Sequence, residues 1–480
     1  MMIPELASGR RSVLAVLTQP WLCVTLLVVT DLVALLLVNA GALLIRHWAG
    51  GMVPVQTYQG LWPLALVFVT VFAAFRLYEV VGVGPAEELK RIFYASSFVY
   101  LLAAAATFVI RTGPDYSRGA FLIAWAGSVV ALPLFRTALR SIVAKRSWWG
   151  VPVAVLGAGM TGRALVKSML ATPQQGLKPI VMLDDDASKC GDYLGVPVLQ
   201  GLSMAPMIAK DLRVTHAILA MPGAPVERLR ILETQNQNAF PHLVIIPNLC
   251  GFASLWVNAR DLGGVLGLEV RRNLLLFGPR LIKRSLDLVL CTIGGIAILP
   301  FIALVALCIK LESRGPVFYS QQRVGRNNTR FNAWKFRSMV ENADQVLETY
   351  LATHPELRAE WNRDHKLRND PRVTRVGRFL RKTSLDELPQ IWNAVLGQMS
   401  LVGPRPIVDA EMAKYEGAID LYLQVRPGIS GLWQVSGRND TTYAERVMLD
   451  SYYVRNWSVW LDIHILIKTI RVVLMSRGAY

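Results

Sequence analysis

Long runs of apolar residues alternate with short polar segments in the first third of the chain. Four runs, near residues 20–45, 58–78, 92–110 and 119–139, approach the ~20 residues that a helix needs to cross a bilayer. The first run does not end in the small-residue pattern of a cleaved signal peptide, so we interpret it as an anchor. The pattern predicts a four-helix transmembrane region over residues 1–147.

Lysine and arginine are unevenly distributed around these runs. Three of them (Arg46, Arg111 and Arg118) lie on one side, and the other side carries Arg10, Arg11, Arg76, Lys90, Arg91, Arg136, Arg140, Lys145 and Arg146. Because cytoplasmic loops are enriched in Lys and Arg, we expect the N-terminus and everything after residue 145 to be cytoplasmic.

A fifth apolar run, Leu286–Ile309, contains Pro300 and has basic residues at both ends. Proline removes a helical hydrogen bond and kinks the helix. Basic flanks favour placing both ends in the cytoplasm. We therefore expect a re-entrant membrane helix over residues 285–310, with a break at Pro300. The alternative, a fifth complete span, would place residues 311–480 outside, away from nucleotide-activated substrates.

The middle of the chain has the pattern of a Rossmann-like α/β domain, predicted over residues 148–250. A buried strand, Val151–Leu156, precedes a glycine-rich turn and an apolar-periodic helix, and a second strand, Ile180–Leu183, leads into a run of aspartates. Further buried strands are expected at 216–221 and 243–246. The order strand, glycine turn and helix is typical of dinucleotide sites, so the possible nucleotide-binding residues are Gly157, Gly159, Gly162 and Asp184.

These glycines have a second interpretation, close packing of the turn. No Tyr-x-x-x-Lys pair of a short-chain dehydrogenase follows, so hydride chemistry is less favoured than a structural or regulatory module.

The sequence pattern predicts a second α/β domain over residues 280–480, after a linker over 251–279. Strands are expected at 316–321 and 331–339, a charged helix at 341–366, and a rigid loop over 426–434 that leads into a strand. Aromatic residues gather near the C-terminus, where they indicate either an interfacial belt or ordinary core: Tyr452, Tyr453, Trp457 and Trp460.

Composition agrees with a membrane protein. The 480 residues are 53% hydrophobic and carry a formal net charge of +17, which suits anionic lipids and anionic substrates. No nucleic-acid-binding motif accompanies the charge, so nucleic acid is not an expected partner. The five cysteines lack metal-ligand spacing and are expected to be reduced, mostly packing thiols.

Residues 381–406 carry the candidate chemistry. Ser384 and Glu387 have the spacing of a capping box, which predicts a helix that begins at the two acids and places Asp386 in its first turn. Such a helix end also attracts phosphate. Arg381 lies just upstream, and Arg405 is held between two prolines. An anionic nucleophile beside these cations suggests phosphoryl transfer onto Asp386; the alternative is an ordinary helix start.

Several motifs give this half of the chain a family resemblance. It resembles the catalytic domain of the large monotopic phosphoglycosyl transferases, the polyisoprenyl-phosphate hexose-1-phosphate transferases. The matching motifs are KRSLD (283–287), GPVFYSQQRVG (315–325), KFRSM (335–339), TSLDELPQ (383–390), MSLVGPRP (399–406) and RPGISGLWQVSGRN (426–439).

The resemblance implies a membrane enzyme of the bacterial inner membrane with its active site facing the cytoplasm. It would transfer hexose 1-phosphate, with galactose the expected hexose and glucose the alternative, from a UDP-hexose to undecaprenyl phosphate. Asp386 would be the nucleophile, and Asp386 and Glu387 would hold Mg²⁺. Arg405, Arg381, Lys335 and Arg337 are candidates for binding phosphate, and a homodimer is expected.

One position departs from the family. Its members usually break the re-entrant helix at Ser-Pro, whereas this chain has Leu299-Pro300. Two other classes of protein stay open on the sequence: a membrane-anchored, dinucleotide-dependent sugar epimerase or dehydratase centred on residues 157–162, and a scaffold for polysaccharide assembly without enzymatic activity.

Overall fold

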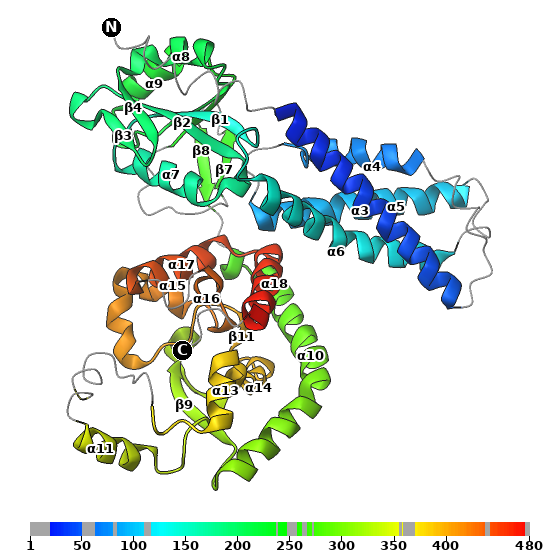
Figure 1. The fold of residues 1–480 in the computed structure, drawn as a ribbon, viewed down its shortest axis with the longest axis vertical. Helices are drawn as coiled ribbons and strands as arrows, with labels where there is room; N and C mark the ends of the chain where they lie inside the picture. The colour runs from blue at the N-terminus through cyan, green and yellow to red at the C-terminus, as the bar shows by residue number, and fades with distance from the viewer. Residues whose placement is uncertain are drawn as a thin grey trace. The chain divides into compact units, whose positions relative to one another are not determined.

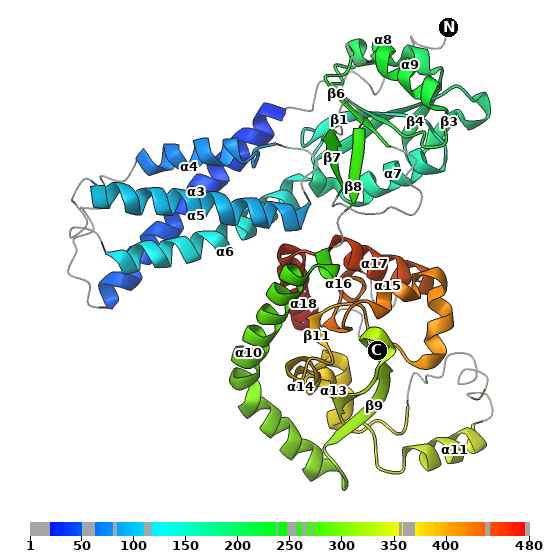
Figure 2. The same ribbon diagram turned by 180° about the vertical axis from the view of Figure 1, so that it is seen from behind.

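The computed structural model describes residues 20–49, 63–79, 84–109, 117–236, 239–246, 257–261, 266–270, 273–354, 358, 370–436 and 442–475. The chain divides into two compact units, Met1–Cys250 and Gly251–Tyr480. Figures 1 and 2 show both units from opposite sides. Arg10, Arg11, Arg111 and part of the 426–439 motif lie outside the described residues.

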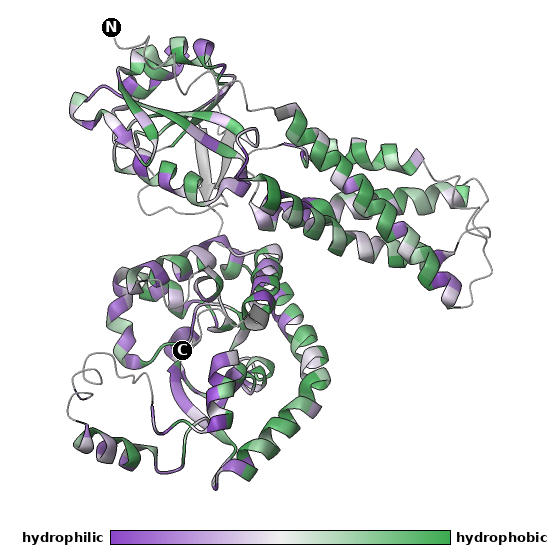
Figure 3. Ribbon diagram, viewed as in Figure 1, coloured by the Kyte–Doolittle hydropathy of each residue, from purple (hydrophilic) through white to green (hydrophobic). Residues whose placement is uncertain are grey.

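The first unit begins with a bundle of apolar helices, coloured mostly green in Figure 3. The helices are α3 (Pro20–Trp48), α4 (Pro63–Ala74), α5 (Pro85–Val109) and α6 (Arg118–Val143). Three are long and apolar enough to cross a membrane, whereas α4 has only 12 residues. The protein is therefore membrane-associated, and the fourth span predicted at 58–78 stays a prediction.

A buried charge network joins three of these helices. Arg136 of α6 is fully buried and contacts Asp31 of α3 at 2.6 Å and Glu88 of α5 at 3.0 Å. The same guanidinium donates to the carbonyl of Leu77 at 3.0 Å. Because a charge in an apolar interior is tolerated only when it is paired and hydrogen-bonded, this network fixes how the helices pack.

The rest of the first unit is an α/β fold built on one six-stranded sheet. Its strands are β1 (Val151–Leu156), β2 (Leu177–Asp184), β3 (Gly191–Tyr193), β4 (Val196–Gln200), β5 (His216–Leu219) and β6 (His242–Ile245). The order is β3-β4-β2-β1-β5-β6, and every pair is parallel except β3 with β4. The helices are α7 (Met160–Ala171), α8 (Ala205–Asp211) and α9 (Val226–Asn236). The α/β pattern predicted from the apolar runs is confirmed.

Within the described residues, the second unit holds three two-stranded sheets, and its helices lie around two of them (Figures 1 and 2). A hairpin of β7 (Val257–Asp261) and β8 (Leu266–Val270) precedes the long helix α10 (Phe277–Glu312). An antiparallel hairpin follows, made of β9 (Phe318–Val324) and β10 (Arg330–Phe336). The parallel pair β11 (Ser400–Val402) and β12 (Gly428–Ser430) forms the third sheet.

Further helices complete this unit: α11 (Ala343–Thr353), α13 (Arg375–Thr383), α14 (Gln390–Val395), α15 (Ile419–Leu423), α16 (Leu432–Ser436), α17 (Tyr443–Asn456) and α18 (Val459–Met475). The charged helix predicted at 341–366 corresponds to α11, which ends at Thr353 and buries Leu347 and Leu351; most of 355–369 lies outside the described residues. The loop at 426–434 contains β12 and then leads into α16, a helix rather than a strand.

The helix α10 is continuous through Pro300. It is apolar and long enough to enter a membrane, and Figure 1 shows it curving along one side of the second unit. A proline inside a helix bends it without ending it when the remaining hydrogen bonds are kept. The helix break expected at Pro300 is thus absent from the structure, whereas the re-entrant path stays a prediction.

A buried polar network holds α10 against the C-terminal helices. Lys283 of α10 donates to Asp462 of α18 at 2.7 Å, and Asp287 accepts a hydrogen bond from Ser400 at 2.7 Å. Tyr453 and Trp457 are buried and donate to Asp462 at 2.8 and 3.1 Å. These two aromatic residues are therefore part of the core, and the KRSLD motif has a structural role.

Candidate active site

Asp386 lies in a tight turn between two helices. Ser384 has a left-handed backbone (φ 57°) and ends α13, its N–H bonding to the carbonyl of Arg381. Residues Leu385–Glu387 form a single 3₁₀ turn, and α14 begins at Gln390. The capping box predicted from Ser384 and Glu387 is wrong, because the serine closes the preceding helix and its side chain makes no cap hydrogen bond.

Glu387 is paired with a lysine from the neighbouring hairpin. Lys335 of β10 donates to its carboxylate at 2.7 Å. Burial alone would raise the pKa of Glu387, but the positive charges of Lys335 and Arg405 outweigh it and hold the pKa below its usual range. Glu387 is therefore ionised, and the pair fixes the turn against β10.

Asp386 has no such partner. Among the described residues, no side chain donates a hydrogen bond to its carboxylate. Burial, together with the negative charge of Glu387, raises the pKa of Asp386, although Lys335 and Arg381 act in the opposite direction. A carboxylate that is desolvated, near cations and without a bonded partner is a good candidate nucleophile.

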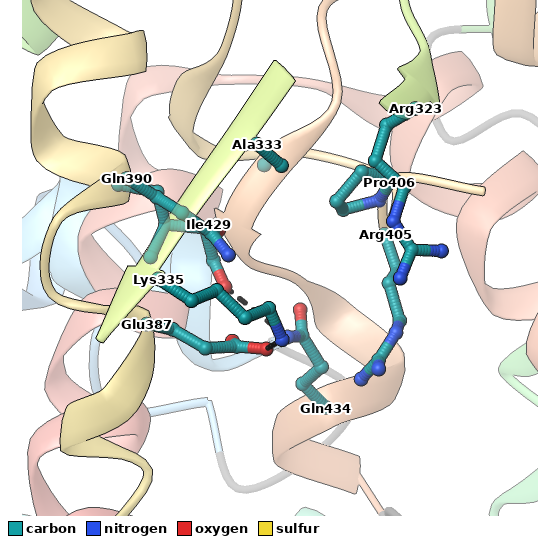
Figure 4. Close-up of a pocket in the computed structure, with 10 residues that line it drawn as sticks. Arg323, Ala333, Lys335, Glu387, Gln390, Arg405, Pro406, Ile429 and Gln434 are labelled. Atoms are coloured by element: carbon teal, nitrogen blue, oxygen red, sulfur yellow. Dashed lines mark hydrogen bonds and ion pairs between the residues drawn. The ribbon is translucent and has the colours of Figure 1, made fainter. Parts of the chain in front are cut away.

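Asp386 borders a cavity of about 1010 Å³, large enough for a sizeable ligand. Lys335, Arg381 and Arg405 line it as well. In Figure 4, Arg323 and Arg405 lie across from the Lys335–Glu387 pair, with Gln434 between them. The site thus places one free carboxylate among several cations.

Arg405 is held by backbone packing and an aromatic ring. It follows Pro404, and its guanidinium lies 5.6 Å from the ring of Trp433. Next to it, Gly403 and Gly428 approach so closely that a Cβ on Gly428 would lie 2.1 Å from the Gly403 nitrogen. No described residue accepts a hydrogen bond from the Arg405 guanidinium, so its donors are available to an anion.

Sequence reasoning missed Arg323. In the β9–β10 hairpin, Arg323 pairs with Phe331 and Tyr319 with Lys335, so Arg323 and Lys335 share one face of the hairpin. Burial and the neighbouring Arg405 lower the pKa of Arg323. Two cations that repel each other in a partly buried site favour an anion between them. The alternation along 319–323 could have identified Arg323, once the hairpin was known.

The other predicted phosphate-binding residues differ in their availability. Arg381 lines the cavity and donates through Nε to Ser338 at 2.8 Å, which orients its guanidinium. Arg337 is buried and donates to the carbonyls of Arg314 and Ser313, at 2.7 and 2.9 Å, at the end of α10. Arg337 therefore caps α10, and its terminal nitrogens are already occupied.

Helix α14 is fixed from both ends. Asn393, fully buried, donates to the carbonyl of Asn332 at 2.8 Å and accepts from the N–H of Trp334 at 3.0 Å, which binds α14 to β10. Arg284 of α10 donates to the carbonyls of Ala394 and Val395, at 2.6 and 2.7 Å, at the C-terminal end of α14. These contacts hold the Asp386 turn between the hairpin and α10.

The glycine-rich turn of the first unit has a different environment. A Cβ on Gly162 would lie 1.9 Å from the carbonyl oxygen of Gly157, and one on Gly157 would lie 2.5 Å from Met221, whereas Gly159 has open space. Asp184 accepts hydrogen bonds from the N–H groups of Ala158 and Asp186, at 2.8 and 3.0 Å. The geometry favours the packing interpretation of these glycines over a nucleotide site.

Comparisons with known proteins agree with this division of the chain. Residues 278–476 match the bacterial sugar transferase family, and residues 73–247 match a family described as a CoA-binding domain. The chain is 39% identical over 376 residues to the UDP-galactose-lipid carrier transferase of Erwinia amylovora, covering 76% of this chain and 77% of the relative.

Two further relatives align over most of their length. Identity is 38% over 403 residues with the undecaprenyl-phosphate galactose phosphotransferase of Salmonella typhimurium, covering 82% of both chains. It is 30% over 463 residues with the UDP-glucose:undecaprenyl-phosphate glucose-1-phosphate transferase of Xanthomonas campestris pv. campestris, covering 93% of both. The chain therefore belongs to the bacterial sugar transferase family and is, as its motifs predicted, a phosphoglycosyl transferase.

Proposed function

We propose that this enzyme transfers hexose 1-phosphate from a UDP-hexose to undecaprenyl phosphate and so begins the synthesis of a surface polysaccharide, such as an O-antigen, a capsule or an exopolysaccharide. The observation that carries this proposal is the free carboxylate of Asp386 at the wall of a large, cation-lined cavity. The names of the relatives supply the two substrates.

In the first step, an oxygen of Asp386 attacks the phosphorus that bears the sugar. A carboxylate–phosphorus bond forms, and the bond from that phosphorus to the oxygen bridging the two phosphates breaks. UMP leaves with the electron pair, and a phosphosugar–aspartyl enzyme remains. Lys335, Arg323 and Arg405 lower the repulsion between the carboxylate and the anionic diphosphate.

In the second step, a phosphate oxygen of undecaprenyl phosphate attacks the same phosphorus. The bond to Asp386 breaks, the carboxylate is restored, and undecaprenyl-diphospho-hexose is formed. Neither step requires a general base, because both nucleophiles are already anions near neutral pH. Among the described residues, none of those that line the cavity is a histidine.

Mg²⁺ is the metal that this chemistry favours. It binds through one or two carboxylates together with substrate phosphates and water, and Asp386 and Glu387 are adjacent carboxylates beside the cavity. No group of three or more acidic, His or Cys ligands occurs among the described residues, so the donor set fits a metal that also needs the diphosphate. When bound there, Mg²⁺ would neutralise phosphate charge.

The membrane position follows from the substrates. UDP-sugars are made in the cytoplasm, so we propose that the cavity faces the cytoplasmic side of a bacterial inner membrane, with four N-terminal spans and α10 entering and leaving by the same face. We also propose a homodimer, because the α/β part of the first unit holds no group that the reaction uses. Protease accessibility in oriented vesicles and light scattering in nanodiscs test these two points.

The test of the reaction uses the full-length enzyme in nanodiscs with Mg²⁺ and either UDP-galactose or UDP-glucose. Without acceptor, we expect one UMP per active site and hexose phosphate on the peptide that contains Asp386, detected by mass spectrometry. With undecaprenyl phosphate, we expect the lipid diphospho-hexose, and galactose to be transferred faster than glucose. Turnover without any modified aspartate would refute the covalent route.

A further inference from the structure

The cavity beside Asp386 is lined by two chemically different groups of residues. One group is charged and contains Lys335, Arg381, Asp386, Glu387 and Arg405. The other group, called here the apolar wall, comes from α14, β11, β12 and α18 and contains Ile391, Leu401, Ile429, Leu466 and Val472. A nucleotide sugar is polar and gains little from contact with the apolar wall. The apolar wall therefore indicates a second ligand with an apolar part.

Helix α18 turns one face toward this cavity. Leu466, Thr469 and Val472 are spaced three residues apart, which places them on the same side of a helix. The hydroxyl of Thr469 donates to the carbonyl of Ile465 at 2.8 Å, and Ser430 of β12 is its partner at 2.5 Å. Because the hydroxyls of Ser430 and Thr469 are bonded to each other and to the backbone, they offer a ligand little further hydrogen bonding.

Exposed apolar residues occur on the two helices that line the cavity. Ile467 and Ile470 of α18 are 49% and 61% exposed, and Trp392 of α14 and its C-cap residue Leu396 are exposed to a similar degree. Helix α10 adds a row of exposed apolar residues, among them Ile293, Ile296, Leu299, Leu304 and Leu307. An apolar belt of this extent on a unit whose longest helix can enter a membrane is covered by lipid.

The apolar wall therefore shares its cavity with Asp386, and two of its helices, α14 and α18, also carry exposed apolar residues that can contact lipid. We propose that this wall, together with Thr469, binds the first isoprene units of the polyisoprenyl phosphate acceptor. The phosphate of that lipid then points toward Asp386, and the remaining chain passes into the membrane between α14 and α18. This inference rests on the proposed function, and assigns a place to its second substrate.

The two half-reactions separate the inference from the proposed function. The acceptor takes part only in the second step, so a residue that binds its chain changes the second step and leaves the first unchanged. A residue that merely stabilises the fold changes both. The cleanest measurements are thus the UMP burst without acceptor and the KM for undecaprenyl phosphate.

The test compares two substitutions on one helix. Leu466→Trp fills the cavity, and Ile467→Trp is the matched control, because Ile467 is 49% exposed, is not among the residues that line the cavity and lies about 100° around the helix from Leu466. In the full-length enzyme in nanodiscs, we expect Leu466→Trp to keep the UMP burst and to raise the KM for undecaprenyl phosphate at least tenfold. Ile467→Trp should change neither value by more than twofold. An unchanged KM in Leu466→Trp, or an equal loss of the UMP burst, would overturn the inference.

A second experiment needs no substitution. A polyisoprenyl phosphate with a diazirine in its first isoprene units is photolysed on the wild-type enzyme, and the labelled residues are mapped by mass spectrometry. We expect label on Leu466, Thr469 or Val472. Label confined to Ile467, Ile470 or the outer face of α10, in an enzyme that transfers sugar normally, refutes the inference alone. An enzyme that neither releases UMP nor transfers sugar refutes the proposed function instead.

Discussion

Asp184, at the end of β2 in the first unit, and Asp386, in a turn of the second, are both carboxylates with a lysine nearby. Asp184 accepts hydrogen bonds from two backbone N–H groups, and the amine of Lys189 lies 3.3 Å from its carboxylate. Asp386 receives no hydrogen bond from any described side chain, because Lys335 is bonded to Glu387 instead. The same residue type therefore has different hydrogen-bonding roles in the two places.

The pKa values of the two aspartates follow this difference in hydrogen bonding. Burial tends to raise both pKa values, but the N–H groups of Asp186 and Ala158 and the charge of Lys189 hold the pKa of Asp184 below its usual range. For Asp386, burial and Glu387 prevail over the nearby cations, and its pKa is raised. A carboxylate whose hydrogen bonds are satisfied inside the protein stabilises the fold, whereas one left unsatisfied is available to a substrate.

The largest expected effect comes from removing the free carboxylate. Asp386→Asn should lower sugar transfer by about three orders of magnitude or more, because an amide cannot form the aspartyl intermediate. Because the pKa of Asp386 is raised in the folded protein, its charged form costs stability above the pKa, and the amide should leave the unfolding temperature equal or higher. Single-turnover UMP release and thermal unfolding of the full chain measure the two effects. An active Asp386→Asn enzyme would contradict the assignment.

The next largest effect is expected at Lys335, the lysine near Asp386 and Glu387. Lys335→Met should slow UMP release on the order of 10²-fold, because it removes a cation from the site of developing charge. Lys335 lowers the pKa values of both Asp386 and Glu387, so its loss should move the acid limb of the pH–rate profile to higher pH. The exposed Lys382, which does not line the cavity, is the matched control. An acid limb that stays in place in Lys335→Met would exclude this coupling.

Much of the fold was predictable because it depends on local pattern. The buried strand Val151–Leu156 was found with its true ends, since a parallel strand covered on both faces is a continuous apolar run between turn residues. The long apolar helices were found for a similar reason. The ends of α4 and α11 were not, since short helices stop where tertiary contacts end.

The site was predictable in its residue types but less so in its partners. Asp386, Glu387, Lys335 and Arg405 do meet at one cavity. Arg337, also predicted, lines the same cavity, but its terminal nitrogens donate to carbonyls at the end of α10. Arg323 was missed because its position depends on the register of β9 against β10. Which acceptor a guanidinium reaches is decided by packing between distant segments, and spacing along the chain does not encode it.

The glycines of the first unit allow a test of the packing interpretation. Gly162→Ala would place a Cβ 1.9 Å from a carbonyl oxygen, and should cost roughly 1–3 kcal/mol of local stability. Gly159→Ala has open space and should change stability by less than about 0.5 kcal/mol. Hydrogen exchange of β1 and β2 in the full-length protein measures both. If Gly162→Ala left local stability unchanged, or if Gly159→Ala lowered it more than Gly162→Ala did, the turn would have a role other than packing.

Asp184 has the smallest expected effect on sugar transfer, and the pH dependence of its contribution to stability tests its structural role. Asp184→Asn removes a charged acceptor from two N–H groups, and should cost about 1–3 kcal/mol of local stability at neutral pH. The pKa of Asp184 is lowered in the folded protein, so its contribution is complete above the unfolded value of about 3.9 and is lost as the pH falls through the folded value. The difference between wild type and Asp184→Asn in hydrogen exchange should therefore shrink in acid. Sugar transfer should change by less than about twofold, and the exposed Asp211, replaced by Asn, should alter neither measurement. A loss of transfer in Asp184→Asn with unchanged exchange would mean that this carboxylate, too, serves a ligand.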